Sequence, residues 1–209
     1  MMIEPASLAV FFGAALLLAI SPGPDNLFVL AQSMTGGRRA GFMITLGLCT
    51  GLLVHMTMVA LGVAAVIKAS SLAFTVLKML GAAYLLYLAY RAFRASGIAV
   101  SAAQGKSLSL TNLYSRGIIM NVTNPKVTMF FLAFFPQFID PENSPVHAQI
   151  ILLGGVFILA TLIIFGSVAA LAGHLGEWMA GSQRAQILLH RMTGVLFAGL
   201  AIKLVLTQR

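Results

Sequence analysis

Apolar residues form six long blocks along the chain, separated by short polar connections. Each block is near or above the roughly 20 residues that a helix needs to cross the hydrocarbon layer of a bilayer. We therefore expect six transmembrane helices and no separate soluble domain. The blocks run approximately from Ala6 to Met34, Ala40 to Ile67, Leu72 to Phe93, Leu113 to Phe138, Ala148 to Leu175 and Ile187 to Leu206.

The composition supports this interpretation. Of the 209 residues, 59% are apolar and only 9% are charged, with a mean hydropathy of +0.96, whereas soluble domains have about 25% charged residues. The first block leads into a proline motif and not into a small-residue cleavage site, so we expect a span and not a cleaved signal peptide. The basic residues behind the net charge of +8 are scattered singly, which argues against nucleic acid as a partner. We predict an all-α integral membrane protein.

A proline motif, Ser21-Pro22-Gly23-Pro24-Asp25-Asn26, interrupts the first block. Prolines inside a helix remove backbone donors, and in lipid such a break is tolerated only where it is buried in protein or lines a cavity. The prolines fit better if a second helix starts here, with Ser21 as its N-cap and Pro22 at its first position. We therefore expect two half-helices that meet inside the membrane.

The fourth block is broken in a similar way by Asn121-Val122-Thr123-Asn124-Pro125-Lys126. A polar, flexible connection from Arg94 to Thr111 separates the two halves of the chain. This predicts two three-helix repeats, 1–95 and 112–209, joined by a cytoplasmic linker over 96–111. Because three is an odd number, the second repeat must be inverted. Broken helices at matching positions of inverted repeats point to a transporter's central binding site.

A weaker internal match supports the repeat. Lys78-Met79-Leu80-Gly81, with Tyr84 three residues later, parallels Arg191-Met192-Thr193-Gly194 with Phe197. The distribution of basic residues predicts that both termini lie on the outer side of the membrane, opposite the cytoplasm. The first, third and fifth connections and their flanks hold Arg38, Arg39, Arg91, Arg94, Lys106, Arg116, Arg184 and Arg191, against Lys68, Lys78, Lys203 and Arg209 on the other side.

Lys126 needs a negative partner, because an ammonium group at bilayer depth costs several kcal/mol. Asp25 is the acidic residue that lies far from every loop, so we expect the two to face each other across an empty cavity. A zwitterionic substrate would replace this pairing, with its carboxylate at Lys126 and its amino group at Asp25. The alternative is a permanent ion pair that joins the first and fourth helices.

Other polar residues at membrane depth have two interpretations each. His55 shares one helix face with Gly47 and Gly51, which predicts a close-packing seam, and it serves either as a structural hydrogen-bonding group or as a proton carrier. Ser21, Asn26, Asn121, Thr123 and Asn124 are candidate cavity donors and acceptors, or helix caps. We expect the phenylalanines at 130, 131, 134, 135 and 138 to pack against lipid and the membrane interface.

The sequence resembles the LysE/RhtB amino-acid exporters over essentially its whole length. The resemblance lies in Ser21 to Pro24, Thr50-Gly51 with His55, Gly81 to Leu85, Asn124-Pro125-Lys126 and Phe135 to Phe138. It implies a multi-pass protein of the bacterial inner membrane that exports amino acids, driven by the proton gradient. A neutral substrate, such as homoserine, threonine or leucine, fits best, because a second cation beside Lys126 is unfavourable.

From these residues we predict a substrate site and a proton pathway. The substrate site comprises Ser21, Pro22, Gly23, Pro24, Asp25, Asn26, Asn121, Asn124, Pro125 and Lys126, and the proton pathway comprises Asp25 and His55. The partners are the amino acid, protons and the lipid bilayer; a homo-oligomer is left open, and no cofactor is expected.

Three other classes of protein fit the sequence less well. A membrane enzyme would need a nucleophile with its base, or a metal cluster, and no such pair stands out. A channel or a small structural subunit has no need for paired broken helices. A metal or small-ion exporter on the same fold is the alternative function, although Lys126 and the shortage of acidic ligands argue against it.

Overall fold

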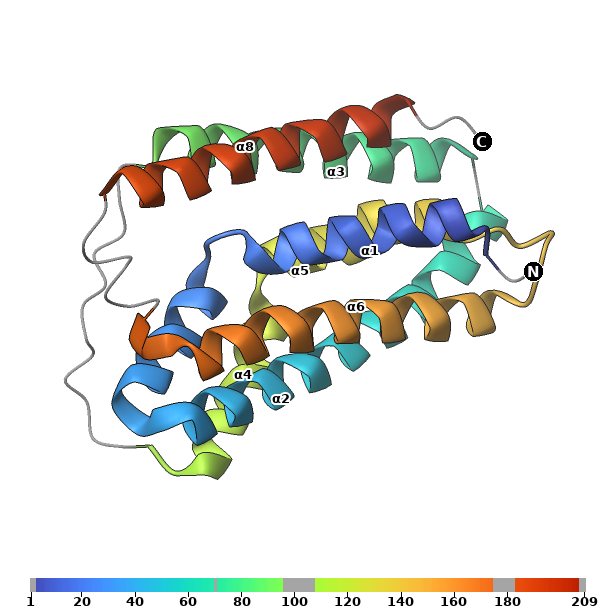
Figure 1. Cartoon of the computed structure of the whole chain (residues 1–209). Helices are drawn as coiled ribbons and strands as arrows, with labels where there is room; N and C mark the ends of the chain where they lie inside the picture. Colours follow the sequence, from blue (N-terminus) through green and yellow to red (C-terminus); the bar gives the residue numbers. More distant parts are fainter. Residues whose placement is uncertain (1–2, 70, 96–107, 175–182, 207–209) are drawn as a thin grey trace.

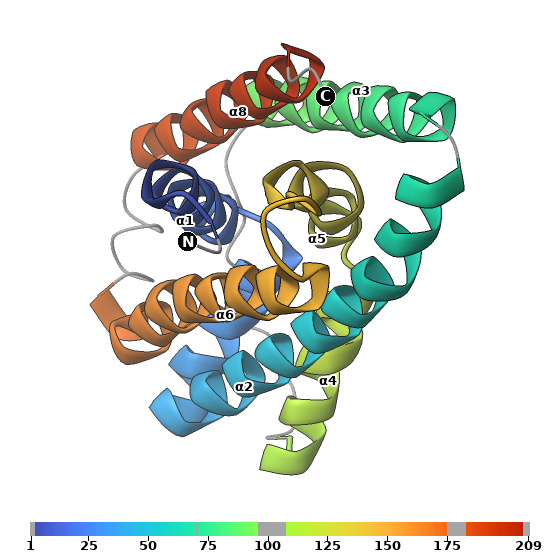
Figure 2. The same cartoon turned by 90° about the vertical axis from the view of Figure 1, so that its right-hand side faces the viewer.

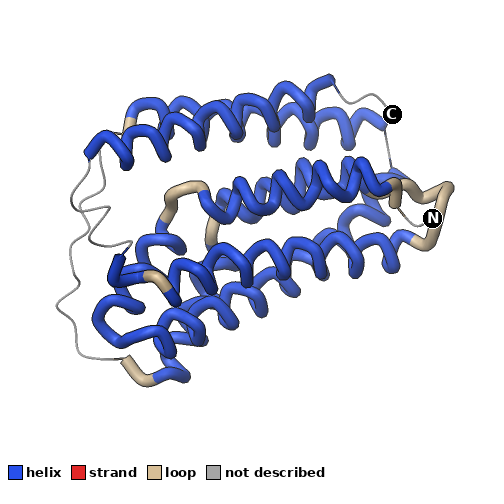
Figure 3. The backbone as a smooth tube through the Cα atoms, in the orientation of Figure 1, coloured by secondary structure: helices blue, strands red, loops and turns tan. Residues whose placement is uncertain are grey.

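The computed structural model describes residues 3–69, 71–95, 108–174 and 183–206, and every regular element in them is helical (Figures 1 and 3). The first half consists of α1 (Pro5–Ile20), α2 (Pro24–Ala69) and α3 (Ser71–Arg94). The second half consists of α4 (Leu110–Thr123), α5 (Pro125–Met129), a π-helical turn η1 (Phe130–Phe134), a 3₁₀ turn η2 (Phe135–Phe138), α6 (Val146–Ala170) and α8 (Gln183–Leu206).

The first predicted block is divided as the proline motif indicates, but it is not followed by a loop. α2 resumes at Pro24 and continues through the predicted connection into the second block. It turns at Gly37, whose φ of 76° lies in the left-handed region that glycine adopts without steric cost. One kinked element therefore holds both the second half-helix and the second predicted span.

The fourth predicted block is also broken where expected. α4 ends at Thr123, Asn124 adopts an extended conformation, and α5 begins at Pro125. The two helical stretches on either side, Leu110–Thr123 and Pro125–Phe138, are bent by 48°. The N–H at the first position of a helix has no intrahelical partner. A proline at this position of α5 therefore costs the helix no hydrogen bond.

The helices form a bundle with one separate outer layer. α3 and α8 run antiparallel as a pair along one side, while α2 packs against α4 and α6, and α1 packs against α6 (Figures 1 and 2). The beginning of α1 and the end of α8 lie at the same end of the bundle (Figure 1). Large apolar side chains on α3 and α8 are exposed, among them Leu80, Tyr90, Leu188 and Val195, as expected for a surface that faces lipid.

The phenylalanine run does not face lipid, so that expectation was wrong. Phe130, Phe131, Phe134 and Phe135 are at most 1% exposed. They belong to η1 and η2, which follow α5, and this segment lies in the middle of the bundle (Figure 2). The rings pack on one another and on Phe11 of α1 at centroid distances of 5.0 to 6.2 Å. The broken fourth helix is thus the centre of the core.

The predicted glycine seam joins α2 to α4. A Cβ added at Gly117 would lie 3.0 Å from the Cα of Gly47 and closer still to the carbonyl oxygen of Ile44. The two backbones can approach this closely only because both residues are glycine. Beside the seam, the hydroxyl groups of Thr50 and Tyr114 are 2.9 Å apart.

The model supports the membrane class. By length and composition alone, three described helical stretches can cross a membrane, Pro24–Gly62, Val146–Ala170 and Gln186–Leu206, and the bent α4–α5 pair makes a fourth. With 16 residues, or about 24 Å, α1 alone is shorter than the hydrocarbon layer. Six crossings arranged as an inverted repeat remain a prediction. Most of the predicted linker, 96–107, lies outside the described residues.

Candidate functional site between the two broken helices

The first break leaves backbone carbonyl groups of α1 without their usual donors. In a continuous helix the Leu18 carbonyl would accept from the N–H of residue 22, but Pro22 has none. The Lys126 ammonium group supplies the missing donor, with its Nζ 3.1 Å from the Leu18 oxygen and 2.9 Å from the Ser21 oxygen. A cation at the carbonyl end of a helix is favourable, because that end carries partial negative charge.

Two details of the first break differ from the prediction. α2 begins at Pro24 and not at Pro22: the Gly23 carbonyl accepts from the Leu27 N–H at 3.1 Å, so Gly23 occupies the N-cap position. Ser21 instead ends α1, with its N–H donating to the Leu17 carbonyl at 3.0 Å. Asn26 reaches back across the break and donates to the Ala19 carbonyl at 2.7 Å.

Asn124 ties the second break to the first. Its side-chain oxygen caps α5 by accepting from the Lys126 N–H at 3.0 Å, and its Nδ2 donates to Oδ2 of Asp25 at 2.7 Å. Both side chains are buried, with Asp25 3% and Asn124 4% exposed. The amide therefore satisfies a helix end and a buried carboxylate together, which a smaller residue cannot do.

The expected direct contact between Asp25 and Lys126 is not formed. The carboxylate binds the Asn124 amide, and the ammonium group binds two backbone carbonyls. The physical reason is that the broken end of α1 offers Lys126 acceptors that a continuous helix would not expose. The permanent ion pair considered from the sequence is likewise absent between these two residues. The two charges still interact over a longer distance.

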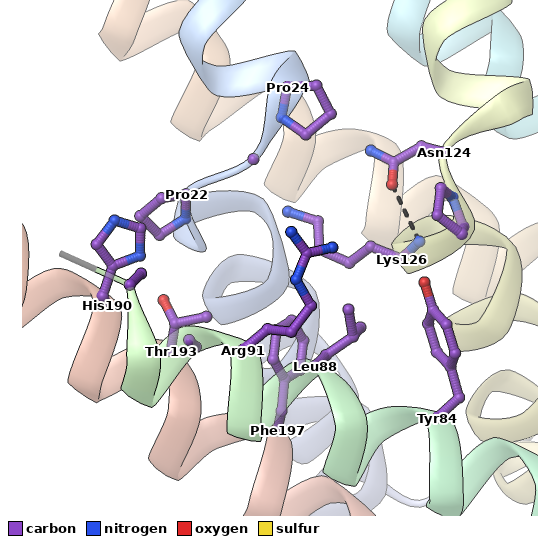
Figure 4. A pocket seen from close by; sticks show the side chains of 14 residues that line it. Pro22, Pro24, Tyr84, Leu88, Arg91, Asn124, Lys126, His190, Thr193 and Phe197 are labelled. Carbon is purple, nitrogen blue, oxygen red and sulfur yellow. Dashed lines mark hydrogen bonds between the residues drawn. The ribbon is translucent and has the colours of Figure 1, made fainter. Parts of the chain in front are cut away.

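A cavity of about 360 Å³ opens beside the breaks (Figure 4). One wall comes from the two breaks, and the other comes from the second half of α3 and the middle of α8. Lys126 and Arg91 both extend into this space (Figure 4). The lining residues are Pro22, Gly23, Pro24, Tyr84, Leu88, Arg91, Ala92, Ala95, Asn124, Pro125, Lys126, His190, Thr193 and Phe197.

The structure brings together six of the ten predicted substrate-site residues. Pro22, Gly23, Pro24, Asn124, Pro125 and Lys126 line the cavity. Ser21, Asp25, Asn26 and Asn121 do not line it. Asp25 lies behind Asn124, which it contacts through a hydrogen bond. Side-chain oxygens of all four, including Oδ1 of Asp25, are buried without a hydrogen-bond partner among the described residues.

Sequence reasoning missed the whole α3–α8 wall. Tyr84, Arg91, His190, Thr193 and Phe197 line the cavity from these two helices. A signal for part of this wall was present, because Tyr84 and Phe197 occupy matching places in the weak internal repeat. For Arg91 the misleading feature was its position at the end of an apolar block, which is also where topology places basic residues.

His55 serves the second break as Lys126 serves the first. Pro125 lacks the N–H that would pair with the Asn121 carbonyl in a continuous helix, and the Asn124 N–H donates to that carbonyl instead at 3.1 Å. His55 lies 3.1 Å from that oxygen through Nε2, which must donate because a carbonyl only accepts. The ring is 0% exposed and stacks on Phe131 at a centroid distance of 5.3 Å. Its Nδ1 has no partner among the described residues.

Two interrupted helices whose breaks meet beside a cavity, within an apolar helical bundle, define a membrane transporter. The chain belongs to the LysE type translocator family, whose model matches residues 16–208.

Curated relatives agree with this family. The chain is 35% identical to the homoserine/homoserine lactone efflux protein of Salmonella typhimurium over 181 aligned residues. The aligned stretch covers 87% of each chain. It is 30% identical over 206 residues to the uncharacterized membrane protein YrhP of Bacillus subtilis, which covers 94% of this chain and 97% of that protein. No solved structure matches the chain.

Proposed function

We propose that this protein is a secondary active exporter of neutral amino acids of the homoserine, threonine or leucine type across the bacterial inner membrane. The observation that carries the proposal is the position of Lys126. Its charged end lies in a cavity where two broken helices meet, and it is held by backbone carbonyls of the opposite half. Homoserine, one of the two compounds in the name of the Salmonella efflux protein, carries both charges and supports the choice of cargo.

A zwitterion can replace the contacts that Lys126 makes in the empty site. Its amino group would take the Leu18 and Ser21 carbonyls, and its carboxylate would take the released ammonium group of Lys126. This differs from the pairing expected from the sequence, in which Asp25 receives the amino group. Asp25 would then stabilise the positive charge of the substrate's amino group without touching it, because Asp25 is hydrogen-bonded to Asn124 and does not line the cavity. Each charge of the substrate would exchange one partner for another, so that neither is left unpaired.

Alternating access around this site would come from the two repeats, 1–95 and 112–209. The packing supports a pseudo-twofold relation between them: α3 pairs with its counterpart α8, and α2 packs on α4 as α6 packs on α1. In such an arrangement the two halves rock around a fixed central site. Both termini would lie on the outer side of the membrane, and the 96–111 connection would lie in the cytoplasm.

Proton coupling would use Asp25, with His55 as the second candidate. Asp25 is buried and hydrogen-bonded to Asn124, and its other oxygen, Oδ1, has no partner among the described residues. A group in this position can take up a proton when the Lys126 charge moves away. The hydrogen bond of His55 to the Asn121 carbonyl favours a structural role for that residue. Within the described residues no cluster of three His, Cys, Asp or Glu side chains exists, so metal export receives no support.

The test is export from cells that overproduce the protein and are loaded with one amino acid at a time from dipeptides. We expect homoserine or a similar neutral amino acid to leave faster with the intact protein and not with the Lys126→Ala variant. Lys203→Ala is the matched control. Lys203 is on α8, where its ammonium group lies over the Phe138 ring, and it does not line the cavity. Equal release by all strains, with equal protein in the membrane, would overturn the proposal.

A further inference from the structure

The cavity has a second cationic side chain, Arg91, that the exporter mechanism above does not use. It projects from the last turns of α3 into the space that Lys126 enters from α5 (Figure 4). Arg91 is exposed, whereas Lys126 is partly buried. The two cations therefore line one cavity, with Arg91 toward its open side and Lys126 toward the breaks.

The charge of this cavity is unbalanced. Among the described residues that line it, one is a lysine, one is an arginine and none is acidic. Asp25 does not line the space and is hydrogen-bonded to the Asn124 side chain, which does. Two like charges at the edge of an apolar bundle repel each other more strongly than they would in water. A bound anionic group would relieve that repulsion.

The two cations differ in what already satisfies them. Lys126 donates to two carbonyls, so part of its hydrogen-bonding capacity is used. Arg91 makes no hydrogen bond or ion pair within the described part of the chain. Its contact is with the face of Tyr87, 5.9 Å from the guanidinium carbon to the ring centroid. A guanidinium group presents paired N–H donors in a plane, which match the two oxygens of a carboxylate.

We infer that Arg91 is the residue by which this protein selects a free carboxylate on its substrate. The inference rests on the proposed function. It assigns the carboxylate to Arg91 at the open side of the cavity, before or together with Lys126, and it predicts that molecules without that negative charge are held weakly. An amino-acid amide, which keeps the amino group and side chain, is such a molecule.

Arg94 provides a matched control on the same helix. It lies three residues further along α3, and its guanidinium carbon is 5.1 Å from the Tyr90 ring, much as Arg91 lies over Tyr87. Arg94 does not line the cavity. Both arginines contribute equally to the basic end that sets membrane orientation. A difference between their variants therefore reports on the cavity and not on topology.

The experiment uses the full chain in proteoliposomes loaded with labelled homoserine at several concentrations. Arg91→Gln, Arg91→Lys and Arg94→Gln are compared with the unchanged protein, and homoserine amide is added with the substrate as a competitor that keeps the amino group but lacks the carboxylate. We expect Arg91→Gln to raise the half-saturating homoserine concentration about tenfold or more, as for loss of a charge-assisted hydrogen bond. The half-saturating concentration for Arg91→Lys should lie between those of the unchanged protein and Arg91→Gln. For Arg94→Gln it should stay within about twofold of the unchanged protein.

The competitor separates charge recognition from general damage. Homoserine amide should inhibit Arg91→Gln at least as well as the unchanged protein, because it has no carboxylate for Arg91 to bind and its amino group carries positive charge. Equal weakening of homoserine and its amide in Arg91→Gln, or equal behaviour of the Arg91 and Arg94 variants, would overturn the inference. Failure of the proposed function looks different, since then the unchanged protein releases no amino acid in the cell experiment.

Discussion

The two proline breaks solve the same backbone problem with donors borrowed from the opposite half of the chain. Pro22 leaves the Leu18 carbonyl without a helical partner, and Lys126 of the second half supplies the donor. Pro125 removes the usual donor of the Asn121 carbonyl, which accepts instead from the Asn124 N–H at 3.1 Å and from His55 of the first half. Each half therefore completes the broken helix of the other.

The two breaks differ in what surrounds the borrowed donor. Lys126 is charged, has a long flexible side chain and reaches into the cavity. His55 is fully buried against Phe131 beside the α2–α4 seam, away from the cavity. The comparison teaches that a broken helix is not by itself a binding site. Under the proposed function, the break whose donor reaches the cavity exchanges partners with the substrate, and the other break holds the bundle together.

Replacing each donor by glutamine is the strongest way to break this comparison. Lys126→Gln removes the positive charge, so we expect export to fall by about tenfold or more. His55→Gln keeps an amide donor for the Asn121 carbonyl, so we expect export within about twofold of the unchanged protein. Initial efflux rates at equal membrane protein levels measure both. Equal losses in the two variants would show that the breaks do not differ in role.

Asp25→Asn sharpens the charged side of the comparison. The substitution keeps a hydrogen-bonding partner for Asn124 but cannot release a proton. We expect net export driven by a pH gradient to be lost, whereas exchange of labelled for unlabelled substrate across proteoliposomes continues. His55→Gln should retain both activities. Loss of gradient-driven export in His55→Gln alone would move the proton pathway to the second break.

A smaller effect is expected at the seam that supports the second break. Gly117→Ala places a methyl group 3.0 Å from the Gly47 Cα and closer to the Ile44 carbonyl oxygen, so α2 and α4 must separate. We expect a loss of about 1–3 kcal/mol in stability, measured by thermal unfolding in detergent. Gly155→Ala on α6 is the control, because nothing lies within 4 Å of its added Cβ. Similar unfolding temperatures for the two variants would contradict the close packing.

The smallest effect is expected at Gly23 in the first break. An added Cβ there would lie 3.4 Å from the Lys126 Nζ, which is ordinary contact with the end of a flexible side chain. We expect Gly23→Ala to change stability by less than about 0.5 kcal/mol. Efflux rates should fall only modestly. A severe loss of folding would mean that the first break is as tightly packed as the second.

Local sequence patterns were sufficient for the elements and for half of the site. Apolar length predicted the helices, proline chemistry placed the breaks near Pro22 and Pro125, and the spacing of Gly47, Gly51 and His55 predicted one packed face. These features depend on residues that are close in the chain. The start of α2 was predicted wrongly. The sequence favoured Ser21 as the N-cap, whereas in the structure Gly23 occupies that position.

The partners of those residues were decided by the tertiary structure. No pattern in the sequence shows that Lys126 donates to carbonyls 105 and 108 residues away, that Asn124 separates it from Asp25, or that Arg91 enters the same cavity. The physical reason is that a carbonyl becomes an acceptor for a distant side chain only where its own helix is broken. Which donor reaches it depends on how the two halves pack. The sequence by itself determined a helical membrane protein with two broken helices, and the packing of its halves decided how the charges are shared.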